Sequence, residues 1–364
     1  MLVFVHEAGH FLAAKAFGVR VDEFGLGYPP KAKSLFRWRG TEFTLNWLPF
    51  GGFVKIFGEN YEQEEAMDAR ATVPTMTGSR ERQSLPRDSF QYKNRGIQAL
   101  ILVAGVLFNF LFAGILFSVG FMMGMPAPVD IGLPVDNAHT AITQVLGGSP
   151  AADAGLKPGD EVLLATRGAA QADLAPDKLS NFISSSAAPL SITVKRNNEI
   201  FTKSLTPASG IVEGKPAVGF GLAEVGTTQL GFWKSIPAGF RTAWELTQLT
   251  ASAFWHFIRE AFSGHADLSQ VSGPVGIVSL VGEATALGFT YLLSFAAIIS
   301  INLAVLNLFP FPALDGGRLL FVIIEAITRR RVPPKVFNWI NTVGFALLVL
   351  LMILVTIRDV RHIL

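Results

Sequence analysis

The sequence opens with MLVFVHEAGHFLAAKAFG, residues 1–18, an apolar stretch that carries His6, Glu7 and His10. It has no basic start and no clear small-residue cleavage site, so it is interpreted as a short membrane-spanning helix and not as a signal peptide. On a helix, positions i and i+4 share a face, so both imidazoles can bind one metal ion. The order H-E-x-x-H is that of a zinc site in which the glutamate takes a proton from water. Ionisable side chains in a spanning segment point to function, whereas the alternative is a pair of buried, hydrogen-bonded histidines.

The composition of the 364 residues indicates a membrane protein: 50% are apolar, 16% are charged and the mean hydropathy is +0.41. Charged residues make up about a quarter of an average soluble domain, so purely soluble and disordered proteins are excluded. The net charge of +2 provides no field for binding nucleic acid. The chain has no cysteine, which excludes disulfides and cysteine-bound metal clusters.

Three further stretches are long and apolar enough to cross a bilayer, which takes about 20 residues. With the first they predict about four spanning helices, at residues 1–18, 96–126, 284–314 and 336–358. Loops rich in Lys and Arg stay in the cytoplasm. The loop at residues 19–95, which holds twelve of them, and the loop at 315–335 are therefore expected inside, and the long segment between the second and third helices outside.

Residues 127–226 change in character to short apolar runs separated by turn signals. Within them, SPAADAGLKPGDEVL at 149–163 resembles the PDZ family, and AVGFGLAEV at 217–225 would supply its Gly-rich carboxylate-binding loop. A PDZ domain binds an extended chain by strand addition, and the alternative is a generic β-rich domain. Residues 227–283 place apolar side chains at helical spacing among basic ones. This pattern favours a helix on the membrane surface, or nearly as well a helix packed on the domain.

A catalytic zinc site needs a third protein ligand, which should lie at membrane depth. Asp315 ends the third predicted helix in NLFPFPALDGG, residues 307–317, where two prolines break the helix and two glycines allow a sharp turn. A broken helix at this depth is tolerated where it is buried in protein or lines a wet cavity. The alternatives are that Asp315 only caps the helix that follows, or that Glu325 or Glu283 is the ligand.

HEAGH in a first membrane helix and N-x-x-P-x-P-x-L-D-G in a later one resemble the site-2 protease family of intramembrane zinc metalloproteases. With the PDZ segment, three further motifs make the chain similar to the bacterial regulator-of-sigma-E protease branch, in its single-PDZ form: FGLG at 24–27, LPFGGFVK at 48–55 and VSGPVGI at 271–277. The chain departs from the family pattern in having only five residues before His6.

The resemblance implies that His6, His10 and Asp315 bind one Zn²⁺ per chain and that Glu7 is the catalytic base. It also implies a membrane-reentrant β-hairpin within residues 19–95. The expected fold class is therefore a polytopic α-helical membrane protein with a membrane-associated β-hairpin and one inserted, extracytoplasmic PDZ domain.

A membrane helix hides its carbonyls in hydrogen bonds, so a substrate has to unwind, and its freed backbone groups then need partners. Segments 21–27, 41–47 and 51–57 are predicted as short strands whose edge can pair with the unwound substrate. Candidate substrate contacts are the glycines of these strands and two amides near the end of the third helix: Gly25, Gly27, Gly51, Gly52, Asn302 and Asn307. The alternative for the two amides is hydrogen bonding between helices, and Asn109 in the second helix is interpreted as structural.

The expected function is zinc-dependent cleavage within the transmembrane segment of single-span proteins, such as anti-sigma-factor-like regulators or signal-peptide remnants. These substrates are expected to be trimmed first by another protease, and the enzyme is expected in the bacterial cytoplasmic (inner) membrane. One alternative is a non-catalytic PDZ membrane scaffold, which would not need the H-E-x-x-H motif. Another is a metal transporter, which would need further ligands along the other helices.

Overall fold

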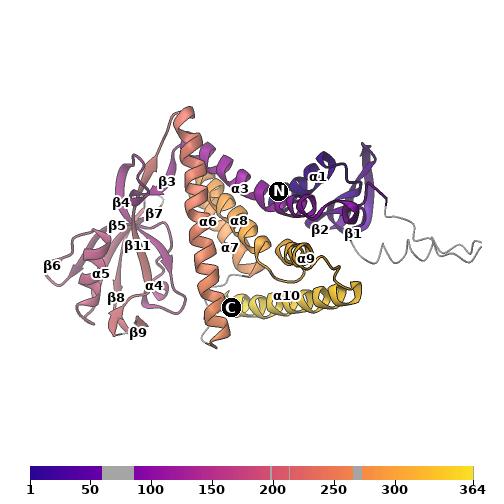
Figure 1. Cartoon of the computed structure of the whole chain (residues 1–364). Coiled ribbons are helices and arrows are strands. Elements are labelled where there is room, and N and C mark those ends of the chain that lie inside the picture. Colours follow the sequence, from indigo (N-terminus) through magenta and orange to yellow (C-terminus); the bar gives the residue numbers. More distant parts are fainter. Residues whose placement is uncertain (60–85, 197–198, 213, 265–272, 364) are drawn as a thin grey trace, which may run out of the picture. The chain divides into compact units, whose positions relative to one another are not determined.

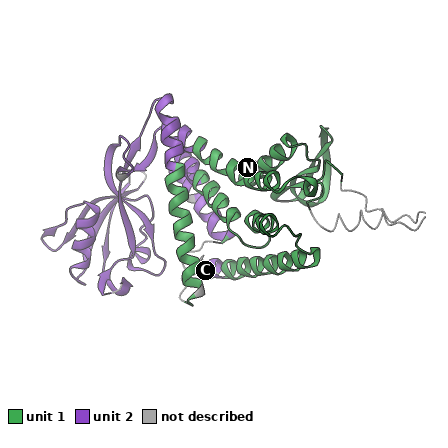
Figure 2. Ribbon diagram, in the orientation of Figure 1, with its two compact units in different colours: residues 1–115, 243–273, 296–357 green, residues 116–242, 274–295, 358–364 purple. Residues whose placement is uncertain are grey.

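The computed structural model describes residues 1–364 apart from 60–85, 197–198, 213, 265–272 and 364. The chain divides into two compact units, each assembled from segments far apart in the sequence (Figures 1 and 2). Unit 1 comprises residues 1–115, 243–273 and 296–357, and unit 2 comprises residues 116–242, 274–295 and 358–364. Helices α3, α6, α8 and α10 each contribute to both units.

Unit 1 begins with helix α1 (Leu2–Ala16) and the long strands β1 (Val21–Trp38) and β2 (Thr41–Ile56). Phe24 of β1 lies opposite both Phe43 and Val54, so this part of β1 is a central strand between the two ends of β2. Residues 52–55 of β2 therefore form an outer strand, whose ladder partner within the described residues is β1 alone.

The three short strands expected in this region are parts of two longer ones. β1 continues beyond residue 27 as far as a tight turn, in which Arg39 and Gly40 both have positive φ angles of 47° and 82°. β2 runs without a break through the expected segment 41–47 and through 51–57 as far as Ile56, although Gly51 bends it with a φ of 88°. Glycine takes such angles at no steric cost, so the strand bends without ending.

An apolar core joins α1, the hairpin and the start of α3 (Arg95–Met123). Phe11 and Ala14 of α1 pack here with Phe24 of β1 and Ile101 of α3, and all four are buried. The rings of Phe11 and Phe24 meet edge to face with centroids 5.6 Å apart. The core therefore fixes α1, which carries the H-E-x-x-H motif, against α3.

Three described helices are long and apolar enough to cross a membrane: α3, α8 (Phe289–Leu308) and most of α10 (Pro334–Ile363). They correspond to three of the four predicted spans. Helix α1 has 15 residues, which at 1.5 Å per residue is about 22 Å and shorter than a typical hydrocarbon core. The count of four spanning helices therefore stays a prediction.

The helix expected at residues 284–314 is shorter in the structure. Its first residues belong instead to α7 (Pro274–Leu287), because Gly288 has a φ of 121° that separates α7 from α8. Its last residues are not helical, because the ring and the missing N–H of Pro310 and Pro312 prevent the helix from continuing. Helix α9 (Asp315–Thr328) then begins at Asp315.

The segment expected on the membrane surface, residues 227–283, forms two helices. The first is α6 (Phe232–Phe262), whose exposed side chains include Trp233 and Trp255, and the second is α7. Part of the VSGPVGI motif falls at residues 271–272, outside the described residues. The helix expected at 96–126 ends at Met123, because Gly124 adopts a φ of 82° and strand β3 begins at Met125.

Unit 2 contains a sheet with the strand order β3-β11-β4-β5-β7-β8, all neighbours antiparallel, and β6 paired with β5. Its strands are β3 (Met125–Pro128), β4 (Asp136–Val145), β5 (Glu161–Arg167), β6 (Ala170–Gln171), β7 (Leu190–Arg196), β8 (Glu199–Leu205) and β11 (Phe220–Thr228). The remaining short elements of the described residues are η1 (Phe90–Tyr92), η2 (Val129–Ile131), α4 (Pro150–Asp153), α5 (Pro176–Ser184), β9 (Ala208–Val212) and β10 (Lys215–Ala217).

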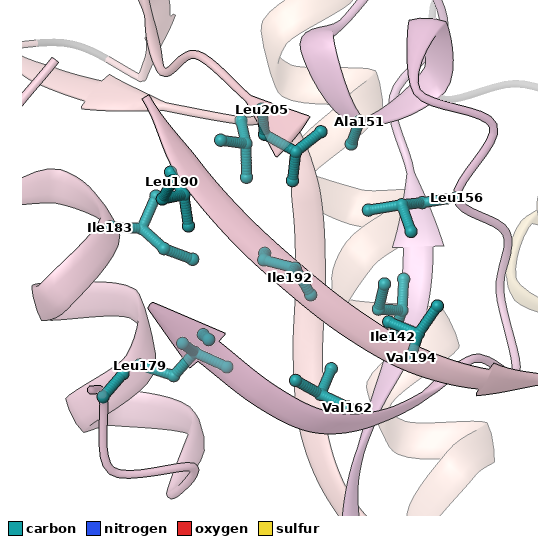
Figure 3. Packing of buried hydrophobic residues seen from close by; sticks show 13 residues of the cluster. Ile142, Ala151, Leu156, Val162, Leu179, Ile183, Leu190, Ile192, Val194 and Leu205 are labelled. Carbon is teal, nitrogen blue, oxygen red and sulfur yellow. The ribbon is translucent and has the colours of Figure 1, made fainter. Parts of the chain in front are cut away.

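The core of unit 2 follows from the periodicity of its elements (Figure 3). Leu190, Ile192 and Val194 alternate along β7 and are all buried, as one face of a strand requires. Leu179 and Ile183, four residues apart on α5, pack against the same cluster. Residues 125–228 thus form a β-rich domain with its own core.

Candidate metal centre and active-site cavity

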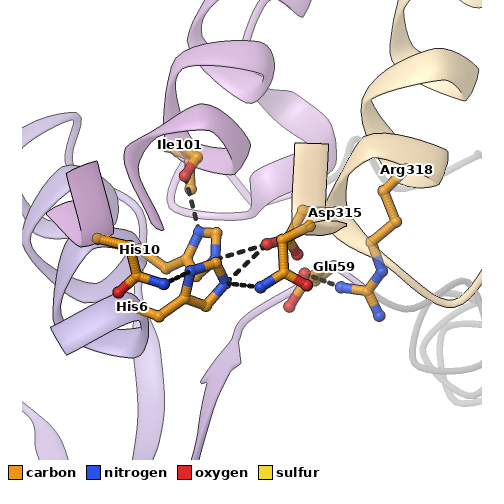
Figure 4. A network of polar contacts seen from close by, with 8 residues as sticks. His6, His10, Glu59, Ile101, Asp315 and Arg318 are labelled. Atoms are coloured by element: carbon orange, nitrogen blue, oxygen red, sulfur yellow. Dashed lines mark hydrogen bonds and ion pairs between the residues drawn. The ribbon is translucent and has the colours of Figure 1, made fainter. Parts of the chain in front are cut away.

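Two histidines of α1 and an aspartate of α9 converge in unit 1 (Figure 4). Oδ2 of Asp315 lies 2.8 Å from Nε2 of His6 and 3.1 Å from Nε2 of His10, and the two Nε2 atoms lie 3.2 Å apart. Both histidines are buried, with 6% of their surface exposed. Among the described residues, no other group of three His, Cys, Asp or Glu side chains comes together in this way.

The donor atoms of the three side chains fit a zinc ion. Zn–N and Zn–O bonds of roughly 2.0–2.2 Å in a tetrahedron place the ligand atoms roughly 3.3 Å apart, close to the three distances found here. Two imidazole nitrogens and one carboxylate oxygen are ligands that zinc prefers, and three protein ligands leave the open position that a catalytic site needs. The alternative of two buried, hydrogen-bonded histidines has the same contacts, so the assignment of a metal site stays a prediction that rests on the convergence of three ligand atoms.

The backbone around Asp315 is held by close contacts that only glycine permits. A Cβ atom on Gly316 would lie 2.2 Å from the carbonyl oxygen of Phe309, and one on Gly317 would lie 2.2 Å from that of Phe311. The proline-containing loop at residues 309–314 therefore folds directly over the first turn of α9. Oδ1 of Asn341 on α10 accepts a hydrogen bond from the backbone N–H of Ala313 at 3.1 Å, which ties the loop to a second helix.

Helix α3 approaches α1 closely at the level of the histidines. A Cβ on Gly9 would lie 2.5 Å from the carbonyl oxygen of Ala104, and a Cβ on Gly105 would lie 2.3 Å from Nε2 of His10. Nδ1 of His10 donates a hydrogen bond to the carbonyl of Ile101 at 2.9 Å. Helix α3 therefore forms one side of the site, and the small residues Gly9 and Gly105 allow the two helices to approach closely.

A cavity of about 420 Å³ opens beside the three side chains, and Glu7, His10 and Asp315 line it. The outer strand of the hairpin forms one wall, because residues 52–56 also line the cavity. The charged side chains Lys55, Glu59 and Arg318 complete the polar part of the lining. Glu59 and Arg318 form an ion pair that connects the residues after β2 to the first turn of α9.

The structure separates the predicted substrate contacts. Nδ2 of Asn307 lies 3.5 Å from Nε2 of His6, whereas Oδ1 of Asn302 accepts a hydrogen bond from Thr250 of α6 at 3.5 Å. Asn302 therefore makes the helix-to-helix contact that was its alternative interpretation, and Asn307 lies at the metal centre.

Of the four predicted glycines, Gly52 lines the cavity. Gly25, Gly27 and Gly51 lie within the hairpin, where a Cβ on each would come closer than 3.0 Å to Phe53, Leu48 and Tyr28, respectively. They shape the hairpin rather than the lining of the cavity.

Of the two rival carboxylates, Glu325 stands apart from the metal centre. Glu325 forms an ion pair with Arg95 at 2.7 Å and accepts a hydrogen bond from the backbone N–H of Val332 at 2.8 Å. Glu283 is a residue of α7, and its side chain lies outside the part of the chain that the structure describes.

Sequence reasoning missed Gly105, Glu59 and Arg318. It interpreted Asn109 as structural, whereas Nδ2 of Asn109 lies 3.4 Å from Nδ1 of His6. Arg318 follows Asp315 by three residues, so helical spacing places it on the same face, and this signal was available. The other three residues reach the site through contacts between α1, α3 and the end of β2, which no local pattern reveals.

The sequence profile of peptidase family M50 matches residues 1–351. The chain is 33% identical over 365 residues to a Clostridium perfringens protein named "Putative zinc metalloprotease", covering 99% of this chain and 95% of that protein. It is 31% identical over 373 residues to a Campylobacter jejuni protein with the same description, covering 100% and 91%. It is 29% identical over 422 residues to "Zinc metalloprotease RasP" of Geobacillus kaustophilus, covering 99% and 95%.

Proposed function

Because the chain belongs to peptidase family M50, the site-2 protease family of zinc metalloproteases, we propose that it cleaves peptide bonds within the transmembrane segments of single-span membrane proteins. The family and the three apolar helices make it a zinc-dependent membrane metalloprotease. The alternative of a non-catalytic scaffold therefore loses its support. The observation that carries the proposal is the cavity in which Glu7, two facing metal-ligand candidates and a strand edge meet.

We assign His6, His10 and Asp315 as the zinc ligands and Glu7 as the general base. When bound, zinc supplies Lewis-acid chemistry, polarising the scissile carbonyl and making water a stronger nucleophile. The carboxylate of Glu7 lines the cavity together with His10 and Asp315, so it can take a proton from the attacking water and give it to the leaving amine. We also assign to Asn307, whose Nδ2 lies 3.5 Å from Nε2 of His6, the role of donating a hydrogen bond to the polarised carbonyl.

The outer strand at residues 52–55 is the proposed partner of the unwound substrate. Its backbone has one ladder partner among the described residues, and its side chains line the cavity. An extended substrate that added to this edge would satisfy its own N–H and C=O groups, as a backbone that has unwound within the membrane requires. The scissile bond would then lie beside Glu7, because Gly52 lies next to it, with a Cβ built on Gly52 3.9 Å from Cγ of Glu7.

The β-rich domain of unit 2 is proposed to be a PDZ domain that reads or excludes substrates outside the membrane. β11 pairs with β4 along its length, but β3 covers only Val225–Thr228 on the other edge. Among the described residues, the first half of β11 therefore has an unpaired edge to which a further strand could add. This edge begins at Phe220, directly after the Val218-Gly219 turn. Helix α5 lies beside β11, which supplies the second wall that a PDZ groove needs.

The proposed setting is the bacterial cytoplasmic (inner) membrane, with the PDZ domain on the extracytoplasmic side. The relatives named above are bacterial, and the basic residues gather in the two loops expected inside. The proposed substrates are single-span regulators or signal-peptide remnants that another protease has shortened first.

The test uses the full-length enzyme in a lipid bilayer with a zinc supply and a substrate that has one apolar segment between soluble flanks. The expected result is cleavage inside the apolar segment, located by mass spectrometry and abolished by a zinc chelator. Glu7→Gln enzyme with the same zinc content is the matched control. Cleavage confined to the soluble flanks would show that the protein is a metalloprotease of another kind.

A further inference from the structure

Asn109 is a polar side chain beside the metal centre that the proposed ligand set leaves out. It lies on α3 and is completely buried, with 0% of its surface exposed. Its Nδ2 atom lies 3.4 Å from Nδ1 of His6, on the side of the ring opposite to Asp315. Its Oδ1 atom is buried and has no hydrogen-bond partner among the described residues.

We propose that Asn109 is a positioning residue for His6. Its side-chain oxygen accepts a hydrogen bond from the Nδ1–H of His6 and so keeps Nε2 of that ring free for the metal. The inference rests on the proposed assignment of His6 as a zinc ligand, and it adds a residue of α3 that touches neither the metal nor the substrate.

The protonation of His6 follows from its surroundings. A neutral imidazole carries one proton, so binding a metal through one nitrogen leaves the proton on the other. Nε2 of His6 faces Asp315 and His10, and the proton therefore belongs on Nδ1, which then needs an acceptor. Metal-bound histidines almost always donate this proton to a carboxylate, a carbonyl or water, and the acceptor orients the ring.

The side-chain amide of Asn109 can provide that acceptor if it is rotated by 180°, which exchanges Oδ1 and Nδ2. The oxygen and nitrogen of an asparagine amide occupy equivalent positions, and the hydrogen-bond network decides between them. With Nδ2 towards Nδ1–H of His6, two donors would face each other while Oδ1 accepted nothing. With Oδ1 towards His6, the Nδ1–H of His6 meets an acceptor, and the two heavy atoms are 3.4 Å apart as before. The exchange breaks no hydrogen bond to Oδ1, because Oδ1 has none among the described residues.

The second histidine has the corresponding partner on the same helix. Nδ1 of His10 donates to the backbone carbonyl of Ile101, eight residues before Asn109. Helix α3 thus offers one acceptor to each histidine, while both Nε2 atoms face Asp315. Ser300 of α8 donates a hydrogen bond to the backbone carbonyl of Asn109 at 2.9 Å and, among the described residues, makes no hydrogen bond with either histidine, so it offers a neighbouring control position.

The first experiment measures zinc affinity, by competition with a chromophoric chelator, for the full-length enzyme and three variants. Asn109→Leu keeps the number and branching of the side-chain heavy atoms but removes the acceptor, and we expect zinc affinity to fall about 10- to 100-fold. Asn109→Asp keeps an acceptor and should therefore bind zinc more tightly than Asn109→Leu by most of that factor. Ser300→Ala, the matched control, removes only the neighbouring backbone contact and should leave zinc affinity unchanged.

The proposal is overturned if Asn109→Leu binds zinc as tightly as Ser300→Ala, or if Asn109→Asp loses as much affinity as Asn109→Leu. A side chain that only fills space would give one of these two results, because Leu and Asp both keep the branched skeleton of Asn and only Asp keeps an acceptor. His6→Ala separates the two levels of the argument: if it retains full zinc affinity, the ligand assignment fails, whereas retention by Asn109→Leu alone rejects only the positioning role.

The second experiment does not depend on whether the Asn109→Leu variant folds. Solid-state NMR of the zinc-loaded enzyme with ¹⁵N-labelled histidine reports which ring nitrogen carries the proton. We expect the two ligating rings to be protonated at Nδ1, and one of these Nδ1 signals to shift in Asn109→Asp but not in Ser300→Ala. A ligating ring protonated at Nε2 next to Asn109, or an unshifted spectrum, would overturn the proposal.

Discussion

At the scale of single residues, Glu7 is the side chain on which hydrolysis is expected to depend without affecting the metal. Glutamine has the same shape but cannot accept a proton in this way, so Glu7→Gln should retain zinc and the fold while hydrolysis falls about 10²- to 10⁴-fold. Single-turnover cleavage and zinc content measured on the same sample check this. Substantial turnover by a zinc-replete Glu7→Gln enzyme would assign the base elsewhere.

Asp315 and Glu325 form a matched pair, because both are acidic residues of α9. Asp315 Oδ2 faces both histidines, so Asp315→Ala should lose most bound zinc. Glu325 is buried and paired with Arg95, so Glu325→Ala should keep zinc but lose stability, on the order of 3 kcal/mol, because it leaves the arginine without its carboxylate. Zinc content per folded chain and thermal unfolding distinguish the two. Full zinc in Asp315→Ala together with loss in Glu325→Ala would reverse the ligand assignment.

At the scale of elements, the crossing of α1 and α3 decides whether the histidines reach the metal position. A Cβ on Gly105 would lie 2.3 Å from Nε2 of His10, so Gly105→Ala should push the helices apart and weaken zinc binding. Gly96→Ala, on the same helix, meets only the Asn94 side chain at 3.4 Å and should keep zinc. Its stability should change little, because Gly96 is the second residue of α3 and helix propensity acts mainly in the interior of a helix. Equal zinc affinity in both variants, measured by chelator competition, would mean that the crossing tolerates a methyl group.

The H-E-x-x-H part of the site could be predicted from the sequence because its geometry is local. His6 and His10 share one face of any helix that contains them. The charge-free segments within α3, α8 and α10 are long enough to be recognised as membrane helices without a structure. Asp315 could be proposed only from its setting among prolines and glycines. Gly105 and Asn109 could not be placed, because their contacts with residues 6–10 depend on where α1 and α3 cross. The boundary between α7 and α8 was missed because it depends on the backbone angle of Gly288.

At the scale of the whole molecule, the proposed division of labour is between a metal centre in unit 1 and a substrate filter in unit 2. The polar residues of the metal centre come from α1, the hairpin, α3, α8 and α9, and each of these contributing residues lies in unit 1. The β-rich domain has its own core. Chemistry and size selection should therefore be separable by a change confined to the domain.

Excision of the domain tests that separation, and the sheet shows where to cut. Thr228, the last residue of β11, lies opposite Met125, the first residue of β3. The domain thus begins and ends at neighbouring positions, and a short linker between Gly124 and Gln229 should replace residues 125–228 without stretching α3 or α6. We expect the excised enzyme to keep its zinc and to cleave a short, pre-trimmed substrate. It should also accept a substrate with a large ectodomain that the complete enzyme refuses.

The control for excision is the complete enzyme with Ile200→Ser, a substitution of an exposed residue of β8, which should leave the discrimination by length unchanged. Cleavage of both substrates is followed in the same bilayers, so the ratio of the two rates is independent of the amount of active enzyme. An excised, zinc-bound enzyme that no longer cleaves the short substrate would give the domain a direct role in positioning. An unchanged ratio would reject the filter, because an extracytoplasmic domain that selects by size has to alter that ratio when it is removed.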